Sequence, residues 1–432
     1  MITPVSQPTN ENYFTTRVDY RINDNQTIFS RFTLDQGDRS NPDDIPVTSA
    51  NPLTQARYAT VQHQWIVTAQ FLVTTRVTYN RTVLASDVLP NVAFPPTTFL
   101  FNKKYPASVQ FAGANRLAAS NQDTFRNVHN RYQFNEDHVY TRGSYSMKWG
   151  FDFQKLGMNI DGGGRDFGEF NWGTIQDFLE DRRPLTFVGA APGSSAVRTL
   201  RQDFLGLYFQ DDWKLRSTLT VNWGLRYEPY SVPTEKWGRL SQVRDWKTAT
   251  ELGNDFGFFR NPSKLHFSPR IGFAWSPGGT GATAVRGGFG LFYIPHDIMP
   301  WKTQTYRNAP YYGTIDSLPP SLGGAVAYVN KVGPAVLSST LSSDSFMQVP
   351  DYNVNSTYEM KLNLTVERDI GYDTSVAVGY LGSRAIHLTR YIACNTRPPT
   401  LVDGREFVSA STPRPNPNLG NCILNYTDGQ GF

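Results

Sequence analysis

The stretch that decides the fold runs from Leu200 to Glu228 and reads LRQDFLGLYFQDDWKLRSTLTVNWGLRYE. In its second half, apolar side chains at every second position from Leu219 to Tyr227 alternate with polar or small ones from Thr218 to Glu228. A period of two indicates an extended strand whose side chains point alternately to the two faces of a sheet. The first half alternates as well, and only Lys214–Ser217 lies between the halves. We therefore expect two antiparallel strands joined by a tight turn.

The two faces of this hairpin differ in chemistry. One is apolar with aromatic residues near its ends, whereas the other carries Arg, Glu, Asp and Asn side chains, which a dry protein core would not accept without partners. A soluble β-sandwich and a membrane β-barrel with a watery lumen both fit this pattern. Strands of about 9–11 residues that end in Trp and Tyr match a tilted crossing of a bilayer. The hairpin alone leaves both architectures open.

The composition excludes several classes of protein. With 432 residues, the chain has room for two or three ordinary domains or one large barrel. Aromatic residues make up 14%, apolar residues only 39%, and the mean hydropathy is −0.43. No run of 18 apolar residues occurs, which excludes transmembrane helices but not strands whose hydrophobicity alternates. The net charge of +4 is spread without a basic cluster, so nothing suggests a nucleic-acid partner.

The N-terminus and the cysteines bear on the compartment. The segment MITPVSQPTNENYF has neither a basic region nor an apolar core, so it is not a signal peptide. Either the protein stays inside the cell or the export signal lies upstream of this chain. Cys394 and Cys422 lie in one segment that we expect to be irregular. A disulfide in an oxidising compartment and two unrelated free thiols both fit that arrangement.

The same alternation recurs along the chain and predicts twelve strands. They span residues 13–20, 26–35, 55–66, 70–82, 129–140, 144–156, 200–213, 218–228, 264–276, 282–294, 356–368 and 374–383. Pro269 lies inside one of them, where its missing N–H predicts a bulge or a local edge. Thr174 is expected to cap a short amphipathic helix, IQDFLEDRR, which ends at Pro184.

Short and long connections between these strands alternate strictly. The short ones are 21–25, 67–69, 141–143, 214–217, 277–281 and 369–373; the long ones are 36–54, 82–128, 157–199, 229–263, 295–355 and 384–432. Such interleaving places all tight turns at one end of a sheet, which outer-membrane barrels do and Greek-key sandwiches and propellers do not. We therefore predict an all-β, antiparallel up-and-down transmembrane β-barrel, here a partial barrel of about 12 strands with long loops on one rim. The first strand descends to the periplasm.

Several longer motifs point to a family. They are LYFQDDWKL, LTVNWGLRYEPY, LHFSPRIGFAWSPGGTGATAVRGGFGLFYI, SYSMKWGFDFQK and NLTVERDIGYDTSVAVGYLGSRAIHL. In combination they resemble the barrel region of Oar-like TonB-dependent receptors of the bacterial outer membrane, over roughly residues 10–395. These are large proteins that usually carry a carboxypeptidase-regulatory-like domain ahead of a plug.

The resemblance implies a function, partners and a place within a longer protein. It implies uptake, or in some members export, across the outer membrane of a Gram-negative bacterium, driven by the TonB–ExbB–ExbD complex acting on a plug. Receptors of this size class have 22 strands, so we expect residues 1–432 to be an internal fragment of the barrel domain. Strands would occupy about 13–383 and an irregular extracellular loop 384–432. The signal peptide, regulatory-like domain, plug and C-terminal strands would lie outside the chain. Twelve strands could close a small barrel, but we expect an open curved sheet with unpaired edges.

Candidate site residues follow from the alternation. Eight charged residues are expected to face the lumen, where they would pair with one another or with the plug, or contact a substrate: Arg76, Lys148, Arg226, Arg270, Arg286, Glu359, Lys361 and Glu367. Four loop aromatics are candidates for ligand contact: Trp301, Tyr306, Tyr311 and Tyr312. Asp211 and Asp212 are adjacent in a strand, so they point to opposite faces and cannot share a substrate proton.

Three classes of function compete. The sequence favours the barrel of a TonB-dependent transporter for a large substrate, with outer-membrane lipid as its surroundings; siderophores, glycans, peptides and proteins all fit as cargo. A passive porin, or a structural barrel that uses its loops for adhesion, is the alternative. An outer-membrane enzyme would need a Ser/His/Asp or acidic set at the loop mouth, which the sequence does not show. We therefore expect no catalytic residues, no cofactor and no metal site.

Overall fold

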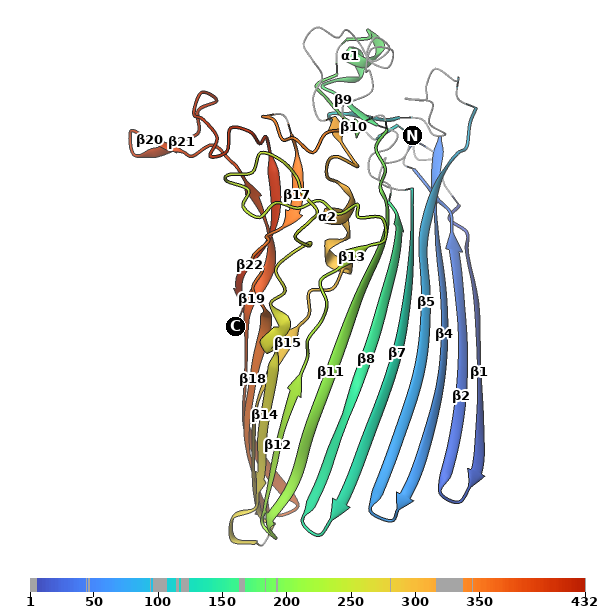
Figure 1. The fold of residues 1–432 in the computed structure, drawn as a ribbon, viewed down its shortest axis with the longest axis vertical. Helices are drawn as coiled ribbons and strands as arrows, with labels where there is room; N and C mark the ends of the chain where they lie inside the picture. Colours follow the sequence, from blue (N-terminus) through green and yellow to red (C-terminus); the bar gives the residue numbers. More distant parts are fainter. Residues whose placement is uncertain are drawn as a thin grey trace.

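The chain forms one tall, curved sheet with loop segments gathered at one end (Figure 1). The computed structural model describes residues 6–43, 45, 47–93, 95, 107–113, 116–117, 124–162, 168–182, 184–191, 193–279, 281–315, 337–343 and 345–431. In this described part, no helix has the length and apolar character needed to cross a membrane.

All twelve predicted strands are present, and each pairs antiparallel with the next along the chain. Their bounds are β1 Thr9–Asn23, β2 Gln26–Arg39, β4 Thr48–Thr68, β5 Phe71–Pro90, β7 Phe125–Arg142, β8 Tyr145–Asp161, β11 Val197–Arg216, β12 Leu219–Tyr227, β14 Phe267–Trp275, β15 Thr283–Ile294, β18 Thr357–Gly371 and β19 Thr374–Cys394. The predicted fold class is confirmed.

The tight turns lie together at one end of the sheet, and the long connections lie at the other (Figure 1). In the last tight turn, Tyr372 and Asp373 have φ values of 57° and 54°. Two consecutive left-handed residues are typical of the type I′ turn, whose twist matches that of the paired strands. Pro269 pairs with Leu225 of β12, while the ladder to β15 begins only at Arg270. The proline therefore sits at a local edge, as its missing N–H predicts.

Several strands are longer than predicted. Near the long loops their apolar side chains change from one face of the sheet to the other, and the predicted strands end where this change occurs. In β8, Trp149 and Phe153 belong to one face, whereas the buried Met158 and Ile160 belong to the other. The apolar side chains change faces where the surroundings of the sheet change. One continuous apolar face ends at that level, and the predicted strand ends with it, although the backbone continues as a strand.

The prediction that residues 384–432 form one irregular segment is wrong. β19 continues to Cys394, β22 (Cys422–Gly431) pairs with it antiparallel, and β17 (Met347–Pro350) pairs with β22 in parallel. Asn425 and Thr427 of β22 are buried, and these polar residues hide the apolar pattern that marks the other strands. β20 (Thr400–Val402) and β21 (Arg405–Phe407) add a small hairpin.

The sheet is open. Its strand path runs from β1 to β22 and β17, and no pairing within the described ranges joins β1 to that other end. β1 is exposed along its whole length. The expected curved sheet with unpaired edges is therefore what the described residues form.

The long loops fold into structures of their own. β6 (Ser108–Phe111), β9 (Glu169–Trp172), β10 (Thr186–Ala190) and β16 (Thr314–Ile315) make a small sheet. The remaining elements are β3 (Asn41–Pro42), β13 (Thr234–Glu235), α1 (Ile175–Leu179), α2 (Lys302–Tyr306), and the 3-10 turns η3 (Ser263–Leu265), η4 (Pro277–Gly279) and η5 (Met299–Trp301). The N–H of Asp177 donates to Thr174 Oγ1 at 3.0 Å, so the predicted helix cap is confirmed.

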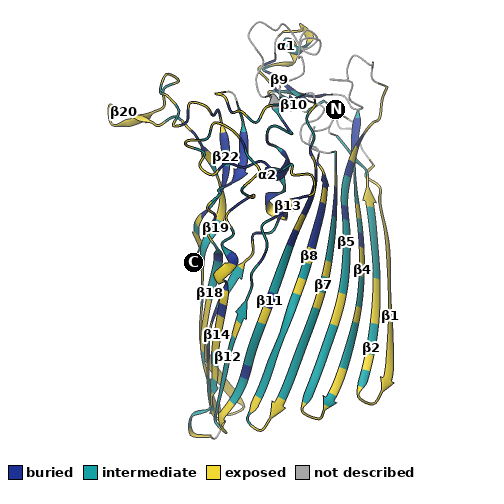
Figure 2. Cartoon of the chain, in the orientation of Figure 1, coloured by how far each residue is buried: buried dark blue, intermediate teal, exposed yellow. Residues whose placement is uncertain are grey.

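The main apolar core lies at the loop end, not along the length of the sheet (Figure 2). Leu156, Met158 and Leu200 of the strands pack there against loop residues that include Phe259 and Trp301. Each such side chain stabilises the packing by roughly 1.5–3 kcal/mol. The loops are thereby fixed over the upper end of one face of the sheet.

Candidate functional site

One face of the sheet exposes large apolar side chains, and we call it the apolar face. Trp223 is 45% exposed, Ile271 59%, Phe273 37% and Leu364 45%, and the strand registers place all four on this face. A contiguous apolar surface spread over many strands is not tolerated in water. It fits the outward, lipid-facing band of an outer-membrane barrel.

The apolar face contains a polar exception between β5 and β7. Glu136 Oε1 lies 3.1 Å from His138 Nε2, and Thr75 Oγ1 donates to Glu136 Oε2 at 3.4 Å. The His138 ring stacks on Trp149, with centroids 5.2 Å apart. These partners compensate a carboxylate and an imidazole that would otherwise be costly beside lipid.

The opposite face is polar and carries all eight charged residues that the alternation assigned to a lumen; we call it the polar face. The ladders show this directly, since Lys148 pairs with Gln210, Gln210 with Gly224, and Gly224 with Arg270. The full set on this face is Arg76, Lys148, Arg226, Arg270, Arg286, Glu359, Lys361 and Glu367.

Most of these charges have partners on the same face. Two pairs form within the set, Arg286 with Glu367 at 2.9 Å and Lys361 with Glu359 at 3.2 Å. Arg226 Nε lies 2.7 Å from Glu228 Oε1. Two further arginines have uncharged partners: Arg76 donates to Gln62, and Arg270 lies over the Phe292 ring. Exposed pairs of this kind contribute only about 0–1 kcal/mol to the free energy of unfolding. Their main effect is therefore to keep this face hydrated and charged.

The polar face is hollowed on its lower half. A cavity of about 620 Å³ is lined by Lys148, Gln210, Asp212, Asn222, Arg226 and Arg270. Arg226 also lines a second cavity of about 280 Å³ that reaches Glu228 and His266 beneath the loops. Two neighbouring cavities that share Arg226 therefore lie on the polar face between the middle of the sheet and the loop end.

Glycine makes room for the long polar side chains that line these cavities. A Cβ atom at Gly206 would overlap the guanidinium of Arg226. The missing side chain therefore lets Arg226 lie across β11 instead of standing up from the sheet. This glycine helps to shape the wall of the cavity.

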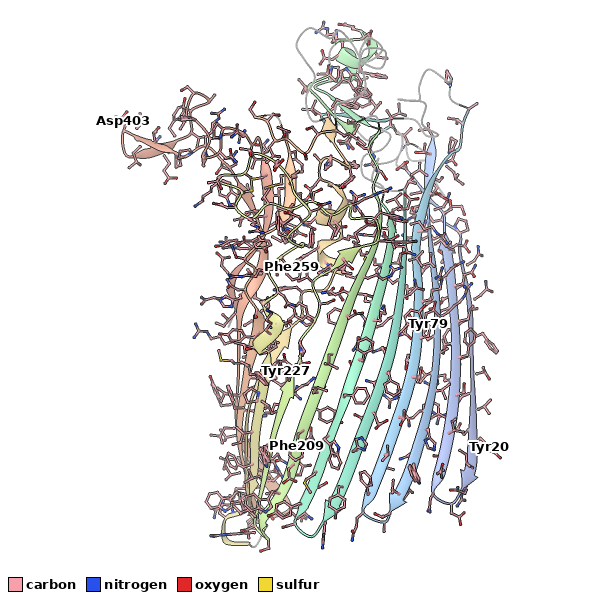
Figure 3. The ribbon with its side chains drawn as sticks, viewed as in Figure 1. Tyr20, Tyr79, Phe209, Tyr227, Phe259 and Asp403 are labelled. Carbon is pink, nitrogen blue, oxygen red and sulfur yellow. A yellow bond between two sulfur atoms is a disulfide. The ribbon has the colours of Figure 1, made fainter. Side chains whose placement is uncertain are left out.

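Three of the four loop aromatics proposed for ligand contact are buried, so that expectation is wrong for them. Trp301 and Tyr312 are 2% exposed and Tyr306 5%, all within the main apolar core. Tyr311 is partly exposed, and its hydroxyl donates to the carbonyl of Gly238 at 3.2 Å. Figure 3 places Phe259 of the same core between the two walls of the curved sheet. The aromatic residues of these loops thus hold the loop end together.

Two charged residues, Arg198 and Glu235, connect the loops to β11. The sequence analysis did not identify either of them as a candidate site residue. Arg198 is 1% exposed and donates from Nε to the carbonyl of Thr305 at 2.9 Å. Glu235 accepts hydrogen bonds from three backbone N–H groups, those of Thr199, Trp237 and Arg239, at 2.8–2.9 Å. The sequence offers one indication of this role. Arg198 and the apolar Leu200 are two residues apart in a strand, so their side chains lie on the same face, which is buried near the loops.

The whole chain matches one family model. The outer membrane beta barrel domain model aligns with residues 1–431. The chain belongs to the outer membrane beta-barrel domain family. Localisation in the outer membrane follows from this membership and from the exposed apolar face. No curated protein matches the chain significantly.

The chain is similar to solved structures of outer-membrane proteins. A double mutant of the ferric enterobactin receptor PfeA from Pseudomonas aeruginosa aligns with a TM-score of 0.52 and 10% identity, over 98% of this chain and 48% of that chain. For the siderophore receptor PirA from Acinetobacter baumannii the values are 0.49, 10%, 98% and 49%. For the outer membrane transporter YddB from Escherichia coli they are 0.47, 11%, 98% and 50%. The chain spans about half the length of these receptors.

The two cysteines of the barrel form a disulfide. Cys394 and Cys422 face each other across β19 and β22 with Cα atoms 5.0 Å apart. They are 5% and 2% exposed and lie in a second apolar cluster with Met347 and Leu424. The disulfide therefore joins the two strands at the loop end.

The adjacent acidic residues Asp211 and Asp212 have separate hydrogen-bond partners on opposite faces of the sheet. Asp211 Oδ1 accepts the N–H of Ser146 at 3.2 Å, while Asp212 Oδ1 on the other face accepts from Asn222 at 2.6 Å. Among the described residues, no group of three or more His, Cys, Asp and Glu side chains is placed to hold a metal ion.

Burial and local partners shift the pKa of two charged groups at the loop end. Partial burial, and to a smaller extent Arg307, lowers the pKa of Lys302 in α2. The ammonium group of Lys302 lies 5.6 Å from the Phe125 ring centroid. In the exposed helix α1, a hydrogen bond from Gln176 and then the charge of Arg182 lower the pKa of Glu180. Lys302 is therefore shifted by its partial burial, and Glu180 by its polar neighbours in an exposed helix.

Proposed function

We propose that this chain is the barrel portion of an Oar-like TonB-dependent receptor of a Gram-negative bacterium, which moves a large substrate across the outer membrane. In this proposal the TonB–ExbB–ExbD complex supplies the energy through a plug that lies against the polar face. The signal peptide, the regulatory-like domain, the plug and the closing strands belong to parts of the protein outside residues 1–432. The function is transport, with no catalytic chemistry.

The observation that carries the proposal is the polar face with its hollow. A wall that exposes apolar side chains to lipid and lines its other side with charged groups is built to surround water or a polar body. The motifs quoted above point to the receptor family independently. The open edges support a larger barrel, because unpaired backbone groups facing lipid cost several kcal/mol each and further strands would pair them.

The test measures whether the hollow responds to TonB. Lys148→Cys places a thiol in the cavity, and a bulky membrane-impermeant maleimide reports its accessibility in cells of the native host. Movement of the plug by TonB should make labelling several-fold faster in energised wild-type cells than in cells without TonB. The native cysteines do not interfere, because they are joined to each other.

Asp403→Cys is the matched control for this experiment. Asp403 lies at the tip of the β20–β21 hairpin, far from the polar face (Figure 3). Its labelling should be equal in the two strains. Equal rates for Lys148→Cys as well would contradict the proposal and favour a passive barrel.

The alternative function is a passive porin or a structural, adhesive barrel. The folded loops favour it, since β6, β9 and β10 form a small sheet of their own, against which Phe178 of α1 packs. The coding sequence ahead of Met1 separates the two functions. A plug domain there supports transport, whereas a signal peptide followed directly by β1 supports the porin.

A further inference from the structure

Four basic residues form a row on the apolar face, directly above its hydrophobic band. Arg57 pairs in register with Arg81, and the same level continues through Asn130 and Gly157 to Arg201. Lys155 lies two residues from Gly157 on the same face. We call Arg57, Arg81, Lys155 and Arg201 the basic row. It spans five neighbouring strands, β4, β5, β7, β8 and β11.

The height of the basic row matches a membrane boundary. Arg81 is ten residues from Phe71, which begins β5 at the tight-turn end. At about 3.3 Å per residue and a tilt of about 40°, this corresponds to about 25 Å, the height of the apolar band in outer-membrane barrels. Immediately below the row, the rings of Tyr79 and Tyr132 pack 4.9 Å apart. Such aromatic pairs mark the level of lipid headgroups.

No acidic partner of the basic row occurs among the described residues. Arg57, Lys155 and Arg201 are exposed and Arg81 is half-buried. In the described part of the chain, none of the four lies within 4.0 Å of a carboxylate, and this includes Asp203, which is opposite Lys155 in register. Arginines elsewhere in the sheet do pair, as Arg17 does with Asp19 at 2.6 Å.

This arrangement is costly unless an anion joins it. Arg57 and Arg81 stand directly opposite each other on one face, and like charges in such positions destabilise a strand pair. An anion between them converts the repulsion into two favourable contacts. The described residues supply no such anion, and the exposed side chains of the row face the surroundings from which one can bind.

Two of the guanidinium groups are already positioned for an anion. Arg81 Nη1 donates to Asn130 Oδ1 at 2.9 Å, and the Tyr79 hydroxyl donates to the same oxygen at 2.9 Å. Arg201 lies across β8, with Nη1 only 3.3 Å from the place a Cβ of Gly157 would occupy. Asn130 and Gly157 are themselves paired. The two arginines therefore reach over adjacent strands from opposite sides, and their planar forks suit phosphate oxygens.

We propose that the basic row binds a membrane lipid whose headgroup carries more than one phosphate, in the leaflet next to the long loops. Arg57 and Arg201 are four strand spacings apart, about 19 Å, so a single phosphate cannot neutralise the row. The hydrophobic band beneath it accommodates the acyl chains. This inference rests on outer-membrane localisation and is independent of TonB-driven transport.

The test compares lipid binding by variants of the receptor purified from its native membrane. Diphosphorylated lipid A is titrated into detergent-solubilised protein, and bound lipid is counted by native mass spectrometry. The combined change Arg57→Gln, Arg81→Gln, Lys155→Gln and Arg201→Gln should weaken binding on the order of a hundredfold. Replacing the three arginines by lysine instead keeps the charges but not the planar forks, and should weaken binding less than the change to glutamine does.

The matched control removes four positive charges from the tight-turn end instead. Arg21→Gln, Arg142→Gln, Lys214→Gln and Arg216→Gln should bind as the unmodified protein does. Heat-modified mobility in gels verifies that each variant is folded. Equal weakening by both sets would mean a general charge effect and would overturn the site. Equal binding of dephosphorylated lipid A, or displacement of the lipid by inorganic phosphate at the same concentration, would overturn the headgroup assignment.

Discussion

Gly150 shows how closely β7 and β8 approach each other on the polar face. A Cβ atom there would overlap the carbonyl oxygen of Glu136 and would lie 3.0 Å from Cε1 of Tyr208. Gly150→Ala should therefore destabilise the protein by about 1–3 kcal/mol, the usual cost of overpacking. Urea unfolding followed by tryptophan fluorescence measures the change in the free energy of unfolding.

Gly37→Ala is the control for this substitution. Its Cβ would meet only the carbonyl oxygen of Asn10, at an ordinary 3.7 Å. Because alanine also restricts the unfolded chain, we expect Gly37→Ala to be neutral or slightly stabilising. If the two variants unfold alike, the spacing of β7 and β8 differs from the one described.

The disulfide is a second feature that acts through single residues. Cys394 and Cys422 are 28 residues apart, and closing a loop of that length in the unfolded chain stabilises the fold by roughly 3–4 kcal/mol in the chain-entropy treatment. The double change Cys394→Ser and Cys422→Ser should lower the free energy of unfolding by up to that amount. Mass spectrometry after alkylation without reductant should find no modified thiol in the unmodified protein. Two modified cysteines would contradict the pairing.

At the scale of elements, the sequence predicted those strands that have one apolar and one polar face. β12 illustrates this, since lipid on one side and water on the other force strict alternation. β22 was missed because its environment is mixed, with Asn425 and Thr427 buried beside apolar neighbours. β17, with four residues, is too short to show any period.

The same reasoning explains which site residues could be predicted. The face of a strand residue depends only on its parity, so all eight charges were assigned to one face from the sequence. The burial of a loop aromatic depends on contacts between distant segments, as when Trp301 packs on Phe259 with ring centroids 5.3 Å apart. No local pattern carries that information, and the expectation for Trp301 failed for this reason.

The difference between the two faces can be tested on one strand. Leu207 of β11 is 44% exposed on the apolar face, whereas Gln210 lines the cavity on the polar face. Leu207→Arg should destabilise the membrane-inserted protein by about 2–4 kcal/mol, the cost of a cation near the middle of the lipid-facing band. Gln210→Arg should change stability by far less. Unfolding in lipid vesicles measures both, and equal losses would show that β11 does not separate lipid from water.

At the scale of the whole molecule, the sheet and the loops are stabilised in different ways. The sheet has little core of its own, and its buried apolar residues gather at the loop end (Figure 2). There the loops cover the upper polar face, while the cavity below stays open. The sheet is therefore held together by strand pairing, and the loops by side-chain packing. The sequence of the loops can thus change without disturbing the pairing of the strands.

This arrangement predicts which parts of the molecule can be reached from each side of the outer membrane. Tyr372, in a tight turn, is 100% exposed, and Asp403 lies at a loop tip at the opposite end of the sheet (Figure 3). In intact cells, a bulky impermeant maleimide should label Asp403→Cys and leave Tyr372→Cys unmodified. After the outer membrane is permeabilised, both should react, because the tight turns then become accessible from the periplasm. Labelling of Tyr372→Cys in intact cells, with protection of Asp403→Cys, would reverse the direction of every strand and place the basic row in the inner leaflet.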